Sequence, residues 1–372
     1  MKTHYKLEGT PNSPVLVFSN SLGANYHMWD ELVPLLLPYF RVLRYDTRGH
    51  GHSSVTPGEY SIELLGQDVI DLVDSLGIET FAFCGLSMGG LIGQWLGIHH
   101  SKRLKHLILC HTAAKIGNAD RWNERIDRIQ RDGTEGMAAE TMDRWFTSAF
   151  QSDQPDKIAF MEQIFAKSPN AGYISCCAAI RDADFQSQLG EIQAKTLVIT
   201  GDEDPVTNVE QAEFLVQHIP NCQLNVLPAR HLSATEHPAD FAELLLQFMV
   251  GTSVQDRGMH VRRTVLGDAH VDRSIQHINE MNADFQSFIT EYAWGEIWTR
   301  PALDKPTRSF ITLALLIALN RKDEFKMHVR AALHNGLTAT EIKELIMHSA
   351  LYCGLPAANE AIHAAEEIIQ SI

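Results

Sequence analysis

The chain has few cysteines, and they follow no pattern. Its six cysteines in 372 residues include no Cys-x-x-Cys pair and no even spacing, whereas disulfide frameworks and zinc sites usually show such patterns. We therefore expect free, mostly buried thiols, no disulfides and no metal site. Long hydrophobic runs are also lacking, because the longest, FITLALLIAL at 310–319, is too short to cross a bilayer. This run is expected to lie in a core.

Positive charge is scarce as well. The sequence has 31 Lys and Arg against 46 Asp and Glu, a formal net charge of −15, and 45% hydrophobic residues. We expect a soluble, acidic, globular protein without a nucleic-acid or membrane partner, since both are negatively charged. A small anionic ligand would need local arginines. The N-terminus lacks a basic segment followed by an apolar stretch, so we expect no export signal and a cytoplasmic protein.

The two halves of the chain have different patterns. Residues 1–250 alternate β-rich runs with helical segments, which predicts an α/β domain with a mainly parallel sheet. The β-rich runs are PVLVFSN, FRVLRYD, ETFAFCG, KHLILCH, AKTLVITGD and NCQLNVLP. None occurs between about 113 and 190, where RWNERIDRIQRDG and ETMDRWFTSAF have helical patterns. An insertion at this place would form a helical cap over the carboxyl ends of the strands.

Residues 257–372 predict a second, all-α domain, because strand signals are nearly absent there. Thr338 and Glu341 form a capping box, and Asn335-Gly336 is a helix stop. The segment MVGTSVQDRG (249–258) combines small and polar residues and predicts a short linker.

The segment GLSMG (85–89) lies between a β-rich run and a helical one. It fits G-x-S-x-G, in which small neighbours allow a sharp strand-to-helix turn that presents a nucleophilic serine, here Ser87. A serine hydroxyl needs a histidine base, which in turn needs a carboxylate. In LVITGDEDPV, Asp204 is preferred to Asp202 as the acid, because it lies farther beyond the strand. LPARHLSATEHP then supplies the base, His231.

An oxyanion that develops at this serine needs two N–H donors. We expect the amide of Met88, directly after the serine, and the amide of Leu22 in the segment NSLG. The remaining histidines show no spacing of metal ligands and are expected to be surface or supporting groups. They include His99, His100, His111 and His237.

These motifs carry a resemblance to a known family. The N-terminal half is similar to the α/β-hydrolases, and FSNSLG, DTRGHG, GLSMGG and HLSATEHP resemble the 3-oxoadipate enol-lactonases over about residues 1–250. Lipases and esterases of this fold usually carry His-Gly where this chain has Asn20-Ser21. The resemblance implies hydrolysis of an anionic enol-lactone by Ser87, His231 and Asp204.

Arginines of the expected cap could hold the carboxylate of such a lactone. They are Arg121, Arg125, Arg128, Arg131 and Arg144. Arg144, with Trp145 beside it and Trp122 on the preceding segment, is the preferred substrate-binding residue. Most of the other arginines alternate with acidic residues at i, i+3 and i+4, as on solvated helix faces.

The helical half resembles 4-carboxymuconolactone decarboxylase over about residues 257–372. The likeness lies in RRTVLGDAHVDRS, EYAWGEIWTRPALDKPTRSFITLALLIAL, HVRAALHNGLTATEI and ALYCGLPAANEAI. More distantly this half resembles the alkylhydroperoxidases, whose Cys-x-x-Cys-x-x-x-His would fall on Arg321, Glu324 and His328. Both thiols are missing, which excludes their thiol chemistry. The resemblance implies a homo-oligomer formed through these helices.

A 4-carboxymuconolactone carries its own electron sink, since electrons released with CO2 can flow through the alkene to the lactone carbonyl. No cofactor or metal is therefore expected. The protein must place carboxylates, stabilise a dienolate and protonate carbon. The candidates are His328 as acid or donor, Glu296 as its partner or the acid itself, and Arg300 and Arg308 as carboxylate clamps. Tyr292, His270 and His348 form a second group.

The decarboxylation product, once protonated at the α carbon, is an enol-lactone that hydrolyses to 3-oxoadipate. The second half would thus make the substrate of the first, through either an acyl-enzyme or direct attack by water. One alternative is a general carboxylesterase or haloperoxidase-like hydrolase with a helical oligomerisation domain. Another is a receptor without catalytic activity, which this fold also supports.

Overall fold

A computed structural model describes residues 2–371 of the chain. The chain folds into two compact units. Unit 1 consists of the residues up to Leu7, Val15–Val33 and Val42–Leu245, and unit 2 consists of Glu8–Pro14, Pro34–Arg41 and the residues from Leu246 on. All six cysteines are free, as expected. Within residues 2–371, no helix combines the length and the apolar character needed to span a bilayer.

Unit 1 is built on a seven-stranded sheet with the order β1-β3-β2-β4-β5-β6-β7. The strands are β1 Tyr5–Glu8, β2 Val15–Ser19, β3 Arg41–Tyr45, β4 Phe81–Leu86, β5 Leu104–Cys110, β6 Thr196–Gly201 and β7 Cys222–Leu227. The pairs from β2 through β4, β5 and β6 to β7 are parallel. Six strands coincide with the predicted runs, which confirms the α/β class. Nearly all side chains of β2, β4 and β6 are buried, as in the centre of a parallel sheet, whereas the edge strand β7 is partly exposed.

Helices cover this sheet and connect its strands. Helix α3 (Met88–His99) packs on β2, β4 and β5, and α9 (Val209–His218) packs on β6 and β7. The other helices of this part of the chain are α1 Val33–Leu36, α2 Ile62–Ser75, α10 Ser233–Glu236 and α11 Pro238–Met249. Short 3-10 turns lie at Tyr26–Trp29, Ser101–Arg103, Glu135–Met137 and Leu189–Glu191.

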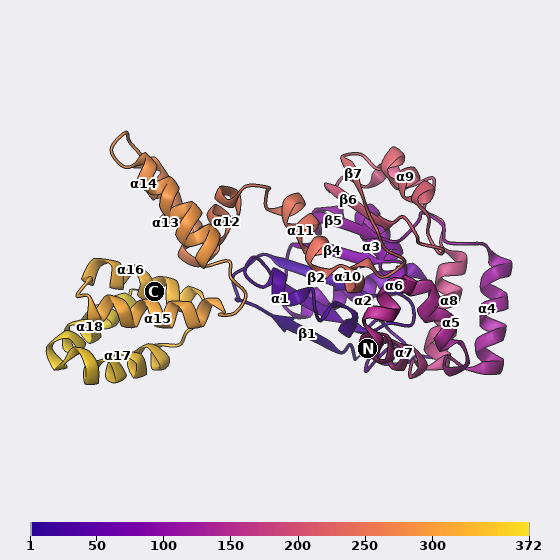
Figure 1. Ribbon diagram of the computed structural model, residues 1–372, viewed down its shortest axis with the longest axis horizontal. Helices are drawn as coiled ribbons and strands as arrows, with labels where there is room; N and C mark the ends of the chain where they lie inside the picture. Colours follow the sequence, from indigo (N-terminus) through magenta and orange to yellow (C-terminus); the bar gives the residue numbers. More distant parts are fainter. Residues whose placement is uncertain (1, 372) are drawn as a thin grey trace. The chain divides into compact units, whose positions relative to one another are not determined.

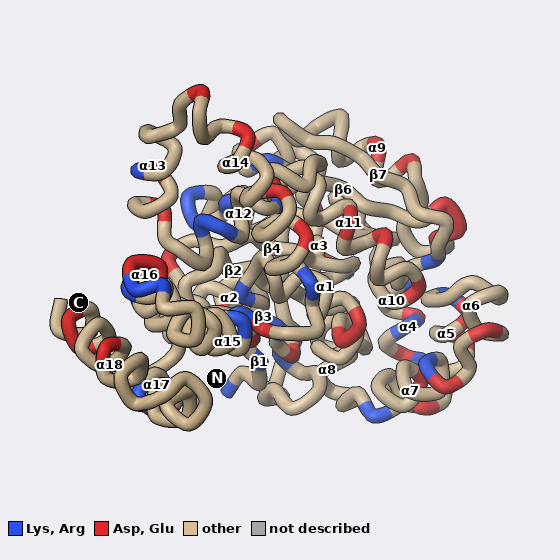
Figure 2. The backbone as a smooth tube through the Cα atoms, turned by 60° about the vertical axis from the view of Figure 1, so that its left-hand side comes forward, with Lys and Arg blue, Asp and Glu red and all other residues tan. Residues whose placement is uncertain are grey.

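Between β5 and β6 the chain forms five helices without a strand. They are α4 Ala119–Asp132, α5 Ala138–Trp145, α6 Ser148–Asp153, α7 Pro155–Ala166 and α8 Asn170–Asp182. Figure 1 shows α4, α5, α7 and α8 grouped at one end of the sheet, and Figure 2 shows acidic and basic residues interspersed along α4, α5 and α7. The helical pattern at 140–150 is split, because Phe146 is extended and Thr147 caps α6. We call these five helices the cap.

From residue 246 to 371 the described chain forms helices and connecting loops without a strand, which confirms the all-α class of this half. Its helices are α12 Val254–Leu266, α13 Asp268–Gln276, α14 Ala283–Phe288, the π-helix η5 Ile289–Ile297, α15 Lys305–Ala318, α16 Lys322–His334, α17 Ala339–Cys353 and α18 Leu355–Ile369. The predicted capping box of Thr338 and Glu341 starts α17, and the predicted helix stop Asn335-Gly336 ends α16. The predicted linker is wrong at its end, because Ser253 and Asp256 form a capping box that starts α12 at Val254.

The run 310–319 is only partly a core segment, contrary to expectation. In α15, Leu313 and Ile317 are buried against α16, α17 and α18. Leu315 and Leu319 lie on the opposite side of the helix and are 56% and 66% exposed. The run is apolar around the whole helix, whereas a single chain covers only one of its faces.

Candidate active sites

Ser87 occupies a strained turn between β4 and α3. Its backbone has φ 58° and ψ −110°, a conformation that costs a residue with a side chain on the order of 1–3 kcal/mol. Two hydrogen bonds hold the turn: the Ser87 N–H donates to the Cys110 carbonyl (2.8 Å), and the Thr112 hydroxyl donates to the Ser87 carbonyl (2.9 Å). The turn therefore projects the serine side chain away from the sheet.

The glycines of GLSMGG are required by close backbone contacts. A Cβ atom on Gly85 would lie 2.0 Å from the carbonyl oxygen of Gly89, and one on Gly89 would lie 2.3 Å from the carbonyl oxygen of Ser19. Any side chain at either position would force β2, β4 and α3 apart. The small residues thus allow the nucleophile turn to form.

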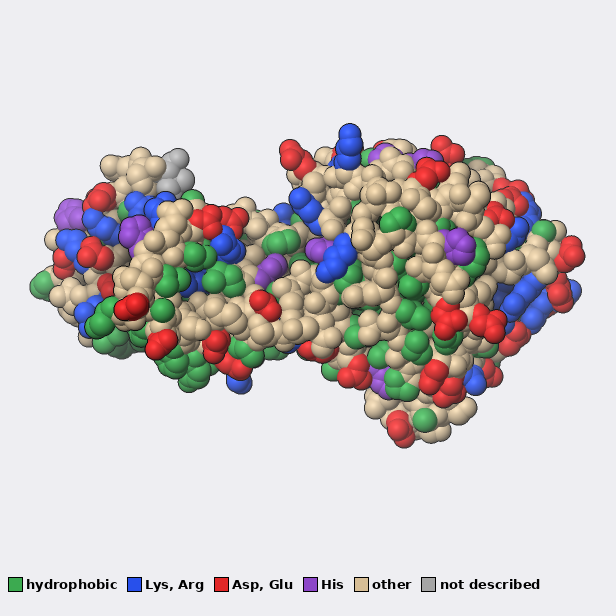
Figure 3. All heavy atoms as spheres, turned by 90° about the horizontal axis from the view of Figure 1, so that it is seen from above, with side chains coloured by type: hydrophobic (Ala, Val, Ile, Leu, Met, Phe, Trp, Pro, Cys, Tyr) green, Lys and Arg blue, Asp and Glu red, His purple; other side chains and the backbone are tan. Residues whose placement is uncertain are grey.

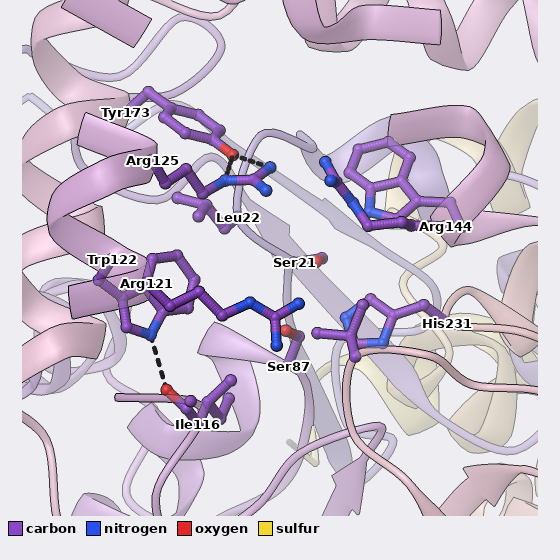
Figure 4. A pocket seen from close by; sticks show the side chains of 13 residues that line it. Ser21, Leu22, Ser87, Ile116, Arg121, Trp122, Arg125, Arg144, Tyr173 and His231 are labelled. Carbon is purple, nitrogen blue, oxygen red and sulfur yellow. Dashed lines mark hydrogen bonds between the residues drawn. The ribbon is translucent and has the colours of Figure 1, made fainter. Parts of the chain in front are cut away.

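The structure pairs His231 with Asp204 and leaves Asp202 at the surface. The Nδ1 atom of His231 lies 2.8 Å from Oδ2 of Asp204, and both side chains are buried. A carboxylate only accepts hydrogen bonds, so Nδ1 of His231 carries the proton and Nε2 is available as the base. Ser87 and His231 line the same pocket, as Figure 4 shows.

Asp204 is held as a carboxylate by several donors. Its Oδ1 accepts from the backbone N–H groups of Val206 (2.8 Å) and Thr207 (3.2 Å), and its Oδ2 also accepts from the Thr207 hydroxyl (2.9 Å). Burial by itself would raise the pKa of Asp204. The attraction of His231 and the hydrogen bonds from His111 and His231 outweigh burial and place the pKa well below its usual range.

His111, which the sequence left as either a surface or a supporting group, is a supporting group of this cluster. Its Nδ1 lies 2.9 Å from the same Oδ2 of Asp204, and its Nε2 lies 2.6 Å from the hydroxyl of Ser233. The signal was available in the sequence, because His111 directly follows a β-rich run, as Ser87 and the acid do.

His111, Asp204 and His231 are also the one group of described residues whose ligand atoms are close enough together to hold a metal ion. Both Nδ1 atoms, however, lie at hydrogen-bonding distance from one carboxylate oxygen. Two protonated Nδ1 atoms cannot bind a metal, so the arrangement fits an Asp–His pair rather than a metal site.

The loop after β2 places the predicted oxyanion donor Leu22 in the pocket beside Ser87. The Asn20 side chain fixes this loop by donating to the Tyr45 carbonyl (2.7 Å) and accepting from the Trp29 indole N–H (2.8 Å). The N–H of Gly23 donates to Nε2 of the buried His50, in the segment DTRGHG (2.9 Å). The second predicted donor, Met88, is the first residue of α3, where backbone N–H groups have no partner within the helix.

The cap supplies the cationic side of the same pocket, which has a volume of about 560 Å³ including its open mouth. Its lining includes Arg121, Arg125, Arg144, Trp122 and Trp145. Thus all three predicted cap residues, Arg144, Trp145 and Trp122, lie where a ligand of Ser87 would contact them. Arg128 and Arg131 are not among the lining residues.

The three arginines differ in their partners. Arg125 donates through Nε and Nη2 to the hydroxyl of Tyr173 (2.8 and 2.5 Å), and Arg144 forms an ion pair with Glu140 (2.5 Å). No carboxylate within residues 2–371 pairs with the Arg121 side chain, which is exposed and extends from α4 toward the part of the pocket that holds Ser87 (Figure 4). Arg121 is therefore the cation best placed to bind an incoming anion.

In unit 2, His328 lies on α16 and is mostly buried. Burial, and then repulsion from His270, lower the pKa of His328 to about 4, while Glu324 offsets this in part. His328 is thus a neutral imidazole at pH 7. Glu296 is exposed on η5, and no hydrogen bond joins it to His328 within the described part of the chain.

Arg308 and Arg300 lie close together near the start of α15. Arg308 donates to the backbone carbonyls of Leu303 (3.2 Å) and Arg300 (2.9 Å). Burial, and then the positive charge of Arg300, lower the pKa of Arg308. Two neighbouring cations are a suitable site for a carboxylate. Arg308 also stabilises the turn before α15 through its hydrogen bonds to the two carbonyls.

Comparison with known proteins places both units in families. The chain belongs to the α/β-hydrolase fold family, whose model matches residues 14–238. It also belongs to the carboxymuconolactone decarboxylase family, whose model matches residues 283–367. The two resemblances seen in the sequence are thereby confirmed, and so is their fusion in one chain.

Particular relatives are similar to each part. 3-Oxoadipate enol-lactonase 2 of Acinetobacter baylyi is 43% identical over 238 residues, 64% of this chain and 89% of the relative. The 4-carboxymuconolactone decarboxylase of the same organism is 53% identical over 116 residues, 31% of this chain and 87% of the relative. The crystal structure of the enol-lactonase from Burkholderia xenovorans superposes with a TM-score of 0.66 at 38% identity, covering 66% of this chain and 96% of that one.

Proposed function

We propose that this chain converts 4-carboxymuconolactone to 3-oxoadipate in two steps. Unit 2 removes CO2 to form 3-oxoadipate enol-lactone, and unit 1 hydrolyses that lactone. The observation that carries the proposal is a single pocket that unites Ser87, the Asp204-paired His231 and three arginines. The decarboxylase relationship of unit 2 supports the first step.

In unit 1, Ser87 Oγ attacks the lactone carbonyl while Nε2 of His231 takes its proton. The amides of Leu22 and Met88 donate to the oxyanion. The ring oxygen leaves as an enolate, which becomes the ketone when it is protonated at carbon. His231 then activates water to hydrolyse the acyl-enzyme, and Asp204 stabilises its imidazolium form in both steps.

The enol-lactone is an anion, so its carboxylate needs a cation in the pocket. Arg121 fills this role, because Arg125 and Arg144 are engaged by Tyr173 and Glu140. The latter two still contribute positive potential, and Trp145 and Trp122 form the apolar wall. Neutral esters of similar size would lack the ionic contact and react less efficiently.

In unit 2, electrons released with CO2 flow into the lactone carbonyl, and no cofactor is needed. A His328 with a pKa of about 4 carries no proton to spare at pH 7, so it acts as an N–H donor to the dienolate rather than as the carbon acid. Arg300 and Arg308 hold the substrate carboxylates. Glu296 is left as the candidate that protonates carbon.

We further propose that unit 2 joins copies of the chain into a homo-oligomer. Most large hydrophobic residues that are exposed in the described chain lie in this unit, and Figure 3 shows apolar side chains gathered on its surface. The apolar ridge, defined as Met347, Leu351, Tyr352 and Leu355, is 58–78% exposed. Such a surface on several helices resembles a core divided between subunits. We expect a cytoplasmic protein that acts on small anionic lactones without nucleic-acid or membrane partners.

The test is to supply 4-carboxymuconolactone to the purified chain and to follow CO2, enol-lactone and 3-oxoadipate. Wild type should form CO2 and 3-oxoadipate in equal amounts. Ser87→Ala should release CO2 at the normal rate and accumulate enol-lactone, with hydrolysis slowed on the order of 10⁴-fold or more. His328→Ala should leave most of the substrate unreacted.

Ser148→Ala, at an exposed position of the cap, is the matched control and should behave as wild type. Hydrolysis of the enol-lactone by Ser87→Ala at the wild-type rate would disprove the assignment of Ser87 as the nucleophile. Faster turnover of neutral aryl esters than of the lactone would instead assign unit 1 as a general esterase.

A further inference from the structure

His111 is anchored at the carboxyl end of β5 in an unusual conformation. Its φ is 45°, in the left-handed region, and its N–H donates to the Ile199 carbonyl of the neighbouring strand (2.8 Å). The side chain is fully buried and does not line the pocket. A residue with a side chain in this region is strained, so the surrounding contacts must compensate for its placement.

The hydrogen bonds of His111 determine where its proton lies. Nδ1 faces the carboxylate of Asp204, which accepts only, so Nδ1 carries the hydrogen. Burial is the largest influence on His111 and lowers its pKa, which the hydrogen bond and charge of Asp204 offset only in part. The imidazole is then neutral, its Nε2 accepts, and the hydroxyl of Ser233 donates to it (2.6 Å).

Ser233, His111 and Asp204 therefore repeat the order hydroxyl, imidazole, carboxylate that Ser87, His231 and Asp204 present to the pocket. Ser233 is fully buried and lies outside the pocket lining, so no substrate reaches it. The second set of three is closed and cannot act as a nucleophile. Ser233 and His111 can therefore affect the reaction only through Asp204, the acid that the two sets share.

We propose that His111 is a positioning residue of the lactonase, which divides the negative charge of Asp204 between two imidazoles and so limits how strongly Asp204 holds the protonated form of His231. The proposal rests on the lactonase function of unit 1. Oδ2 accepts from Nδ1 of both histidines and from the Thr207 hydroxyl. Each donor reduces the charge that remains for the others.

Sharing the acid has a consequence for the pH range of activity. A carboxylate that His231 does not share would favour the imidazolium and keep the base protonated up to a higher pH. The charges of Asp204, His231 and Glu236 act on His111, and both histidines act on Asp204. His111 thus extends the working range of His231 toward acid.

The experiment is the pH profile of kcat/KM for enol-lactone hydrolysis in the full chain. His111→Phe with Ser233→Ala removes the donor to Asp204 without leaving a hydroxyl unpaired, and the acidic limb should move up by about 0.5–1 pH unit. His111→Asn retains an amide N–H donor at the position of Nδ1, so its limb should stay within about 0.2 unit of wild type. An unchanged limb in the double variant, or equal shifts in both, would overturn the proposal.

A measurement on the wild-type chain keeps the proposal testable even if these variants fold poorly. With ¹⁵N-labelled histidine and residue-by-residue assignment, NMR should show the imidazole of His111 protonated at Nδ1 and without a proton at Nε2 across neutral pH. Assignment of its Nδ1 as unprotonated would overturn the proposal. The proposed function fails separately, if the wild-type chain does not hydrolyse the enol-lactone.

Discussion

Asp202 and Asp204 both follow β6, but only one of them reaches the site. Asp202 is exposed, whereas Asp204 turns inward and accepts hydrogen bonds from five groups. At the scale of single residues, function is decided by such differences in environment. The same holds for the pocket arginines Arg121, Arg125 and Arg144. They are the same type of residue, but only Arg125 and Arg144 already pair with another side chain.

Asp204→Asn should lower kcat for enol-lactone hydrolysis by about 10⁴-fold, because an amide cannot fix the tautomer of His231 or stabilise its imidazolium form. Asp202→Asn is the control and should remain within about threefold of wild type, since its exposed carboxylate contacts no catalytic group. Steady-state kinetics on both variants checks this. Equal losses in the two would mean that the acid has been assigned to the wrong residue.

His328 makes the stability of the chain depend on pH. Its pKa is about 4 in the folded chain and about 6.5 when unfolded, so between these values the unfolded chain binds more protons. The free energy of unfolding should therefore fall as the pH drops from about 6.5 to about 4. His328→Gln should weaken this dependence by up to ~3 kcal/mol.

Urea denaturation at several pH values measures the free energy of unfolding of the wild-type and His328→Gln chains. His363→Gln changes an exposed histidine of α18 and should keep the wild-type dependence. If both variants followed the wild-type curve, His328 would not be held neutral by burial.

At the scale of elements, the nucleophile turn depends on close contact between β2, β4 and α3. Gly89→Ala places a methyl group 2.3 Å from the Ser19 carbonyl oxygen. We expect a loss of about 1–3 kcal/mol in stability and a large loss of lactonase activity. Gly190→Ala introduces the same group where no atom lies within 4 Å and should leave the melting temperature unchanged. A calorimetric scan of the two variants makes the comparison.

The cap is attached to the histidine loop through Glu236. Its carboxylate accepts from the N–H of Thr147, in the cap, and from the N–H of Arg230, next to the catalytic histidine. The Leu232 N–H also donates to the Trp145 carbonyl (3.1 Å). These hydrogen bonds hold the cap and the loop of His231 in a fixed relation to each other.

Glu236→Gln replaces one acceptor oxygen by an NH2 group that faces an N–H donor. Losing such a bond costs about 1–3 kcal/mol, and kcat/KM for the enol-lactone should fall about 10-fold, while CO2 release stays normal. Glu203→Gln, at an exposed position of the β6–α9 loop, is the matched control. A wild-type kcat/KM in Glu236→Gln would show that the attachment does not matter to catalysis.

At the scale of the whole molecule, one chain carries both unit 2, which forms the enol-lactone, and unit 1, which hydrolyses it. The two units are chemically independent, because each holds its own complete set of candidate groups. The exposed apolar surface of unit 2 is the basis of the further proposal that several chains associate.

Leu351→Glu with Leu355→Glu places two charges on the apolar ridge and should convert the oligomer to a monomer at micromolar concentration. Lys102→Glu, at an exposed position of unit 1, should leave the assembly intact. Analytical ultracentrifugation separates the outcomes. A wild-type chain that sediments as a monomer would disprove the oligomer proposal directly.

Much of this protein is determined locally and was therefore predictable from the sequence. Six strands, the capping box at Thr338, the nucleophile turn and both family resemblances follow from short-range patterns of apolar, small and capping residues. The start of α12 was missed because Ser253 and Asp256 resemble a polar linker until their mutual capping is seen.

Only the tertiary structure decided which distant side chains meet. His111 and Asp204 are 93 positions apart, and no local pattern reports that two histidines converge on one oxygen. Likewise, the selection of Arg121 depends on the partners that occupy Arg125 and Arg144. Contacts between remote segments are fixed by how the strands and cap pack, whereas secondary structure and turns are fixed by neighbours along the chain.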